Sequence, residues 1–192
     1  MKTRRSVRSF QTAQIPQDVI RNCIAIAASA PSGANTQPWS FILVAHPQMK
    51  KAIRQKAEEI ERIFYSKRIT SNWKKKLEPL ETNADKPFLE HAPYLICIFV
   101  QKYGYDPKGK RCPHYYPFES VGIATGFLIY SLHLLGIASL PYTPAPMTFL
   151  LEFLGRPKNE KPYMILAVGY PDRNFIPPSL EKKKEEEYLE IL

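Results

Sequence analysis

Arg4-Arg5-Ser6-Val7-Arg8 and Pro31-Ser32-Gly33-Ala34-Asn35 are the two stretches that say most about this chain. The first places three guanidinium groups and a hydroxyl within five residues. The planar fork of Arg suits a phosphate group because it donates paired, charge-assisted hydrogen bonds. The second is a turn of small residues, where backbone N–H groups can closely approach a flat ring. A basic arm on a solvated face is the alternative interpretation of the first stretch.

Length and composition predict one domain with a substantial core. The chain has 192 residues, 44% of them hydrophobic, and its mean hydropathy of −0.31 is typical of a soluble protein. A net charge of +9 favours anionic partners. Because there is no zinc finger, RNP-like strand or repeated basic helix, nucleic-acid binding is not expected. The predicted domain spans residues 1–192, with a lid over about 57–90 and a C-terminal arm over about 171–192.

The three cysteines predict neither a disulfide framework nor a metal site. Cys23 and Cys97 lie in apolar patterns and are expected to be core thiols. Cys112 and His114 lack a second pair of ligands. This usage favours a reducing, cytoplasmic setting, and no apolar run follows the first arginines as it would in a signal peptide.

An uncharged stretch from Ser120 to Leu151 raises the question of a membrane span, because it contains no Asp, Glu, Lys or Arg. His133, several hydroxyl residues and the prolines from Pro141 onward argue against one. We expect a buried core or dimer-interface helix, and no membrane contact.

Hydrophobic spacing predicts alternating helices and strands. Helices are expected after Pro16 to near Ala30, from Pro47 to about Ile69, over 119–135 with Gly136 ending the helix, and over 147–154. Strands are expected over 40–44, 94–100, 139–142 and 163–168, the first two buried on both faces. Residues 73–90 are interpreted as a partly helical lid and 103–116 as a loop. The tail from Pro171 cannot be core; it either wraps a partner subunit or frays.

Three runs together carry a family resemblance: Arg4–Arg8, the Ala-Pro-Ser-Gly-Ala-Asn-Thr-Gln-Pro-Trp run ending at Trp39, and Val168-Gly169-Tyr170-Pro171. With them, the chain from Arg4 to about Lys183 resembles the FMN-dependent nitroreductase superfamily. The resemblance implies an α+β fold with a central mixed sheet flanked by helices. It also implies an intertwined homodimer that exchanges C-terminal arms.

A triplet in the lid, Glu61, Tyr65 and Lys86, is similar to that of the iodotyrosine deiodinase (halotyrosine dehalogenase) branch. Positions 61 and 65 share one helix face, so both side chains can reach one ligand. A free amino acid is a zwitterion, and Glu61 and Lys86 supply a partner for each of its charges. Exposed charges on a solvated helix are the alternative interpretation.

The resemblance implies FMN as the cofactor and no metal. Arg4–Arg8 would hold its phosphate, ribityl chain and pyrimidine end, Ser32 and Gly33 would contact the ring, and Thr143 would act catalytically through a hydroxyl near ring nitrogen N5. The backbone N–H of Ala34 would meet the substrate's phenolate oxygen. The full cofactor set is Arg4, Arg5, Ser6, Val7, Arg8, Ser32, Gly33, Pro141, Tyr142, Thr143 and Lys182, with Lys183 as the alternative to Lys182; the substrate set is Ala34, Glu61, Tyr65 and Lys86.

The activity implied by the resemblance is reductive dehalogenation of halotyrosines to tyrosine and halide, with NAD(P)H or a reductase as electron donor. A general NAD(P)H-dependent nitroreductase or quinone reductase is one alternative, and a non-catalytic flavin-binding protein is another. The chain departs from the family at Leu140-Pro141-Tyr142-Thr143, where the family often has a run of threonines. Pro141 has no N–H, so any backbone donor at that position is lost. Relatives in vertebrates carry a membrane anchor ahead of this domain, whereas this chain is expected to be soluble.

Overall fold

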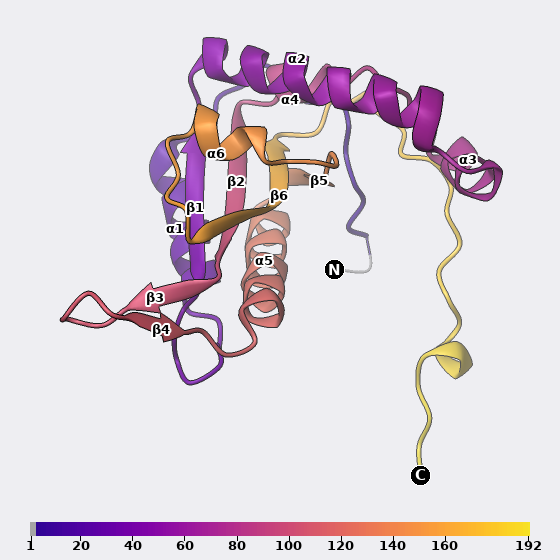
Figure 1. Ribbon diagram of the computed structural model, residues 1–192. Helices are drawn as coiled ribbons and strands as arrows, with labels where there is room; N and C mark the ends of the chain where they lie inside the picture. The colour runs from indigo at the N-terminus through magenta and orange to yellow at the C-terminus, as the bar shows by residue number, and fades with distance from the viewer. Residues whose placement is uncertain (1–2) are drawn as a thin grey trace.

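A computed structural model describes residues 3–192 as helices packed on both faces of one sheet, with a separate hairpin and a long tail (Figure 1). The helices are α1 (Gln17–Ala28), α2 (Pro47–Ile63), α3 (Ser71–Leu77), α4 (Phe88–His91), α5 (Pro117–Leu134) and α6 (Phe149–Phe153). The strands are β1 (Trp39–Val44), β2 (Tyr94–Gln101), β3 (Tyr103–Tyr105), β4 (Arg111–Pro113), β5 (Ala138–Tyr142) and β6 (Glu160–Gly169). A π-helical turn (Phe64–Arg68) continues α2, and short 3-10 turns cover Glu78–Leu80 and Glu185–Glu187.

The main sheet has the strand order β1-β2-β6-β5, and each neighbouring pair runs antiparallel. The parallel component of the expected mixed sheet is confined, among the described residues, to one bridge between Ser6 and Ser139. That bridge lays the N-terminal arginine segment along β5. The segment is therefore positioned by the sheet rather than free in solvent.

Strand β2 divides the core between the two faces of the sheet because successive side chains point to opposite sides. Ile96 and Ile98 pack with α1 and α5 on one face. Leu95 and Phe99 pack with α2 and α4 on the other face. Cys23 and Cys97 are both buried, one in each cluster, which confirms their assignment as core thiols.

Two sequence-based expectations need correction. Strand β1 lies at the edge of the sheet and most of its side chains are only partly buried, so it is not covered on both faces. The expected loop over 103–116 contains the antiparallel hairpin β3–β4. Asp106 fixes its turn by accepting hydrogen bonds from the backbone N–H groups of Lys108 and Lys110, 2.9 Å each, and Gly109 supplies a positive φ of 77°.

Helix α5 buries one face and leaves the other apolar and exposed. Ala124, Leu128 and Leu132 face the core, whereas Phe127, Tyr130 and several neighbours are 40–63% exposed. Gly136 follows the helix with a φ of 71°, as expected for a residue that ends it. Across residues 3–192, the structure contains no helix with the length and hydropathy of a membrane span.

The tail leaves the body after β6 (Figure 1). The expectation that it has no core role needs one correction, because Phe175 packs, partly buried, against the core cluster that contains Val7 and Phe10. The start of the tail is held by Phe10, which bridges to Pro171, and by Ser9, whose carbonyl accepts from the N–H of Asp172 at 3.0 Å. Every residue beyond 178 is exposed. The same contacts therefore hold the N-terminal segment and the end of β6 together.

Gly169 is the tightest point of this junction. A Cβ added there would lie 2.7 Å from Pro93 Cδ and 2.8 Å from Phe10 Cδ1. We expect Gly169→Ala to lower the free energy of unfolding by about 1–3 kcal/mol through overpacking. Urea unfolding followed by circular dichroism measures this.

A Phe10→Leu background provides the control for that prediction. The smaller side chain leaves room beside position 169, so the cost of Gly169→Ala should shrink in the double variant. Equal costs in both backgrounds would show that the contact with Phe10 does not limit this position.

Candidate functional site

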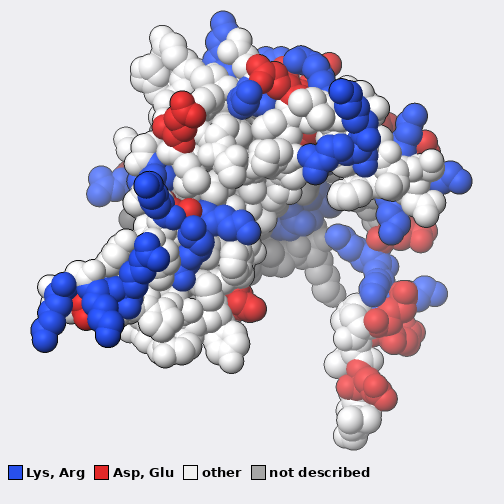
Figure 2. All heavy atoms as spheres, viewed as in Figure 1, with Lys and Arg blue, Asp and Glu red and all other residues white. Residues whose placement is uncertain are grey.

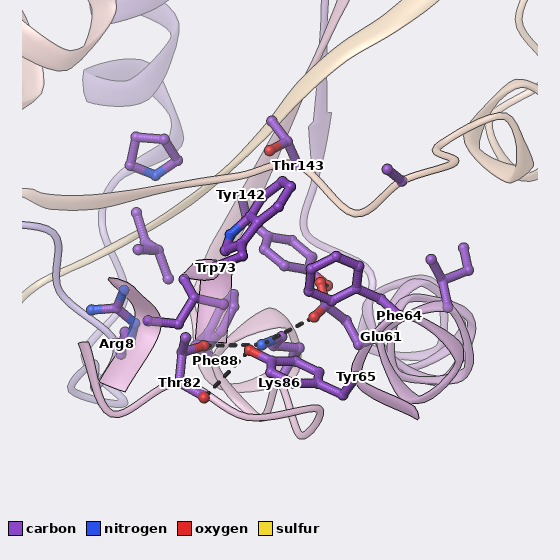
Figure 3. A pocket seen from close by; sticks show the side chains of 15 residues that line it. Arg8, Glu61, Phe64, Tyr65, Trp73, Thr82, Lys86, Phe88, Tyr142 and Thr143 are labelled. Atoms are coloured by element: carbon purple, nitrogen blue, oxygen red, sulfur yellow. Dashed lines mark hydrogen bonds and ion pairs between the residues drawn. The ribbon is translucent and has the colours of Figure 1, made fainter. Parts of the chain in front are cut away.

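A cavity opens between the end of α2, the lid and the loop after β5, and Figure 3 shows how side chains from all three converge on it. Its wall is partly aromatic and partly charged. The lining side chains that Figure 3 labels are Arg8, Glu61, Phe64, Tyr65, Trp73, Thr82, Lys86, Phe88, Tyr142 and Thr143. All three lid residues singled out from the sequence are among them.

Glu61 and Lys86 form an ion pair in the cavity wall. Lys86 Nζ lies 3.6 Å from Glu61 Oε2, and the two side chains are 5% and 13% exposed. Lys86 also donates to Thr82 Oγ1 at 3.1 Å and to the carbonyl of Asn83. Burial lowers the pKa of Lys86, and the nearby Glu61 carboxylate opposes that shift. The site therefore holds two opposite charges that are largely withdrawn from water.

Two tyrosines flank this pair. Tyr142 donates its hydroxyl hydrogen to Glu61 Oε1 at 3.0 Å, and Tyr65 donates to the carbonyl of Thr82 at 3.3 Å. Lys86 Nζ lies 5.6 Å from the ring centroid of Tyr65 and 5.8 Å from that of Tyr142. Burial, and then the neighbouring Glu61 carboxylate, raise the pKa of Tyr142, so its hydroxyl remains a donor at neutral pH.

The end of α2 places Glu61 and Tyr65 on the same side. The helix continues past Ile63 into the π-helical turn that contains Phe64 and Tyr65, and such wider turns occur often at functional sites. The Phe64 ring packs edge-on against both Tyr65 and Trp73, with 5.4 Å between centroids. These contacts join α3 to the end of α2 and give the cavity its aromatic side.

Glu58 holds the lid segment against α2. Its carboxylate accepts from the backbone N–H of Lys86 at 2.7 Å and from Arg54 Nε at 2.8 Å. Burial acts to raise the pKa of Glu58, but the hydrogen bonds from Arg54 and Lys86 outweigh it and leave the pKa lowered. Sequence reasoning noted Glu58 only as a neighbouring charge. Its position three residues before Glu61, on the same helix face, is the signal that could have identified it.

The N-terminal arginine segment lies beside this cavity. Val7 is buried, and its N–H donates to the carbonyl of Ser139 at 3.5 Å. Arg8 points to the cavity with a half-buried guanidinium that has no ion pair within residues 3–192. Arg4 and Arg5 line a second cavity with Ser139 and His133, and Arg5 donates to the carbonyl of Pro178. The structure thus gathers Arg4–Arg8 along β5, between two cavities.

The turn that contains Ser32, Gly33 and Ala34 is elsewhere. Gly33 bridges to Tyr115, ahead of α5, and its N–H donates to Ser120 Oγ at 3.3 Å. Ala34 has a φ of 48°. None of these three residues lines either cavity described above. Within one chain, Arg4–Arg8 and the Ser32–Ala34 turn therefore share neither cavity.

The remaining predicted residues divide in the same way. Pro141, Tyr142 and Thr143 all line the first cavity. Lys182 is exposed on the tail and lines neither cavity. The structure therefore brings together the lid triplet, Arg8 and the loop after β5, and leaves the small-residue turn and Lys182 apart from them.

Comparison with known proteins shows which family has this architecture. Residues 1–170 match the Nitroreductase family model, and the chain belongs to the nitroreductase family. It is 46% identical to an iodotyrosine deiodinase of Haliscomenobacter hydrossis, over 95% of this chain and 82% of that one. It is 40% identical to one of Nematostella vectensis, over 98% of this chain and 72% of the other. Within the family, the chain belongs to the iodotyrosine deiodinase branch.

A solved structure supports the same placement. A crystal structure of oxidized iodotyrosine deiodinase bound to FMN and 3-iodo-L-tyrosine matches the structure of this chain with a TM-score of 0.82 and 31% identity. The match covers 100% of this chain and 94% of that chain. The expected family and the nitroreductase-like fold of the chain are confirmed.

Removing the Glu58 carboxylate tests how the lid is held. We expect Glu58→Gln to cost about 1–3 kcal/mol of unfolding free energy at pH 7, because a buried charged acceptor is lost. The folded pKa of Glu58 is lowered, so its contribution is present above the unfolded pKa and is lost as the pH falls through the folded value. Urea unfolding at pH 7 and at pH 3 measures the difference, which should shrink at the lower pH.

Glu59→Gln is the matched control, because Glu59 is exposed and, among residues 3–192, pairs only with Lys56, at 2.7 Å. Its effect should stay below about 1 kcal/mol. If the cost of Glu58→Gln were as small, or did not change with pH, Glu58 would not be the anchor of the lid.

Proposed function

We propose that this protein is an FMN-dependent reductive dehalogenase that converts halotyrosines to tyrosine and halide. The observation that carries the proposal is the buried pair of Glu61 and Lys86, 3.6 Å apart in an aromatic cavity beside the arginine segment. A chain that is 46% identical to an iodotyrosine deiodinase thus has oppositely charged groups where an amino acid substrate would need them.

The residues present fit FMN. The guanidinium of Arg8 is half-buried and has no ion pair in the described part of the chain. Together with Arg4 and Arg5 in the adjoining cavity, it is suited to bind a phosphate group and polar ring edges. Val7 lines the adjoining cavity with Arg4 and Arg5, and Ser6 precedes it in the chain. Pro141, Tyr142 and Thr143 line the same cavity as Arg8. When bound, FMN supplies two electrons that can be delivered singly. Thr143 is the proposed hydrogen-bond partner of ring nitrogen N5.

The charged pair is the proposed clamp for a zwitterion. Glu61 would take the substrate ammonium and Lys86 the carboxylate, with Tyr65 completing the site. Their mutual pairing satisfies both buried charges before substrate arrives, which matters because an unpaired buried charge is costly. Tyr142 holds the Glu61 carboxylate in place through its hydroxyl.

The proposed reaction exchanges a carbon–halogen bond for a carbon–hydrogen bond. It consumes two electrons and one proton and releases the halogen as an anion. The protein's part is to hold the aromatic ring against the cofactor, to neutralise both charged ends of the substrate and to exclude water as the lid orders. Phe64 and Trp73 form the apolar side of that lid.

We infer that the complete site needs two copies of the chain. Ser32, Gly33 and Ala34 lie away from the cavity that holds Glu61 and Lys86. Helix α5 presents an exposed apolar face that includes Phe127 and Tyr130, and such a face favours burial against a second copy. The partner's turn would then supply the ring contacts and the Ala34 N–H, and the exchanged tail would bring Lys182 to the phosphate.

Glu61→Gln tests the clamp. We expect it to weaken 3-iodotyrosine binding by about 2–5 kcal/mol, because the substrate ammonium would be left without its charged partner. Binding is measured by quenching of flavin fluorescence on titration with 3-iodotyrosine. FMN content after purification should be unchanged, since Glu61 is not in the proposed cofactor set.

Glu59→Gln again serves as the control for a lost carboxylate on α2, and it should bind 3-iodotyrosine like the wild type. An unchanged affinity of Glu61→Gln for 3-iodotyrosine, with turnover of nitroaromatics or quinones retained, would favour a general nitroreductase. It would also show that Glu61 does not bind the substrate ammonium.

Phe127→Asp tests the requirement for two copies. A charge on the exposed apolar face of α5 should convert the dimer to monomer and reduce bound FMN, because half of the site would be missing. Light scattering coupled to gel filtration gives the mass, and the flavin absorbance gives the occupancy. Ile26→Asp is the control, since Ile26 is similarly exposed at 48% but lies on α1.

The control variant should remain dimeric and retain FMN. A wild-type protein that is monomeric with full FMN occupancy, or a Phe127→Asp variant that still dimerises, would contradict the two-copy site.

A further inference from the structure

A basic patch surrounds the β3–β4 hairpin, and Figure 2 shows Lys and Arg side chains gathered over it. The patch consists of six exposed cations: Lys102, Lys108, Lys110, Arg111, Lys158 and Lys161. None of them forms an ion pair with another described residue, although Lys and Arg elsewhere in the chain do. Asp106, in the turn of the hairpin, is an acid within the patch, but positive charge remains in clear excess there.

The cations belong to one surface because the hairpin base is hydrogen bonded to the segment before β6. Lys102 N–H donates to the carbonyl of Asn159 at 2.8 Å, and Asn159 Nδ2 donates to the carbonyl of Tyr103 at 2.8 Å. Two acids of the hairpin and of β6 neutralise at most one of the six charges. Asp106 accepts from the backbone of the turn, and Glu160 is buried and paired with Arg156 at 2.7 Å.

The hairpin holds its charges on an ordered scaffold. The Arg111 guanidinium lies 4.3 Å from the ring centroid of Tyr103, and Tyr103 packs edge-on against Tyr105 with 5.6 Å between centroids. Tyr105 is 58% exposed beside the cations. A mixture of fixed positive charge and an exposed aromatic ring suits recognition of an acidic protein surface.

The patch also adjoins the small-residue turn. The chain leaves β4 at Pro113 and at Tyr115 bridges to Gly33. The packing is close, because a Cβ on Gly33 would lie 2.3 Å from the Tyr115 carbonyl oxygen. His114, between them, has both ring nitrogens buried and without a hydrogen-bond partner in the described structure, and its ring lies against Gly104. Hairpin and turn thus form one packed unit.

We infer that this patch, Lys102, Lys108, Lys110, Arg111, Lys158 and Lys161, is the docking surface for an acidic one-electron carrier protein that reduces the enzyme. The inference rests on the proposed function, in which the Ser32–Ala34 turn contacts the flavin ring, so that a carrier on the hairpin is close to the ring. Each halide released requires two electrons and one proton. Two carrier molecules are therefore oxidised per turnover, and solvent supplies the proton.

Electron carriers of this kind dock through small, weak interfaces in which charge governs the encounter. A patch of six exposed cations, three of them on the hairpin and none in an ion pair with a described residue, matches that description. RNA or an anionic membrane would also attract positive charge, but neither supplies the electrons that the reaction consumes, and the position of the patch beside the turn would then have no purpose.

The test uses the FMN-loaded enzyme with 3-iodotyrosine and two electron sources. One source is a [2Fe–2S] ferredoxin kept reduced by NADPH and its reductase, and the other is dithionite. Lys108→Glu combined with Lys110→Glu reverses charge at the hairpin tip without changing the backbone groups that Asp106 accepts from. We expect the KM for ferredoxin to rise about tenfold or more at low salt, with dithionite-driven iodide release unchanged.

Arg21→Glu combined with Lys51→Glu is the matched control, because both residues are exposed on helices away from the hairpin and neither is in an ion pair in the described structure. It should leave both rates unchanged. The ferredoxin-driven rate of the wild type should fall steeply as salt is added, whereas the dithionite-driven rate should not.

Three results would overturn the inference: a hairpin variant that matches the wild type with ferredoxin, a wild type that turns over with dithionite but not with ferredoxin, or a hairpin variant that loses RNA or anionic-vesicle binding while its ferredoxin kinetics are intact. Failure of the proposed function is distinguishable, because the wild type would then release no iodide with dithionite.

Discussion

Glu61 and Lys86 are held almost out of water, and neither charge could remain there alone, because removing one partner of a buried pair typically costs several kcal/mol. The surrounding structure supplies what this pair needs. Glu58 holds the backbone of Lys86 against α2, Tyr142 reaches from β5 to Glu61, and Thr82 accepts from the ammonium. Three segments far apart in sequence meet at this point. The cavity wall therefore carries one positive and one negative charge before any ligand enters. A zwitterion requires that arrangement.

Most of the fold could be predicted from local patterns, and the exceptions have a common cause. The spacing of apolar residues predicted α1, the uncharged composition predicted α5, and apolar runs predicted the strands of the main sheet. The same runs could not say which strand lies at an edge, so β1 was expected to be covered on both faces. The β3–β4 hairpin was missed because its strands are three residues each and, with Gly104, Arg111 and Pro113 among them, contain no apolar run. Its turn, from Asp106 to Gly109, carried the one local signal.

The site was predictable to the extent that it is local. Glu61 and Tyr65 share a helix face, and their spacing shows this directly. Lys86 was found through the family resemblance, because no spacing rule connects a lid lysine with a glutamate 25 residues earlier. The side chain of Tyr142 was not foreseen as a partner of Glu61, since the two residues are 81 positions apart. Glu58 was within reach of sequence reasoning, but its backbone partner at Lys86 exists only in the folded chain.

The length of α5 explains why one chain does not complete the proposed site. The small-residue turn packs at the start of this helix, through Tyr115 and Ser120. Strand β5 follows the end of the helix, and the arginine segment lies along β5 through the bridge between Ser6 and Ser139. Eighteen helical residues span about 27 Å, so the length of α5 separates the turn from the arginine segment of the same chain. In a symmetric pair with the two α5 helices antiparallel, the start of one lies beside the end of the other. Each turn would then reach the other copy's cavity, and the exposed apolar face of α5 would become the contact that brings them together.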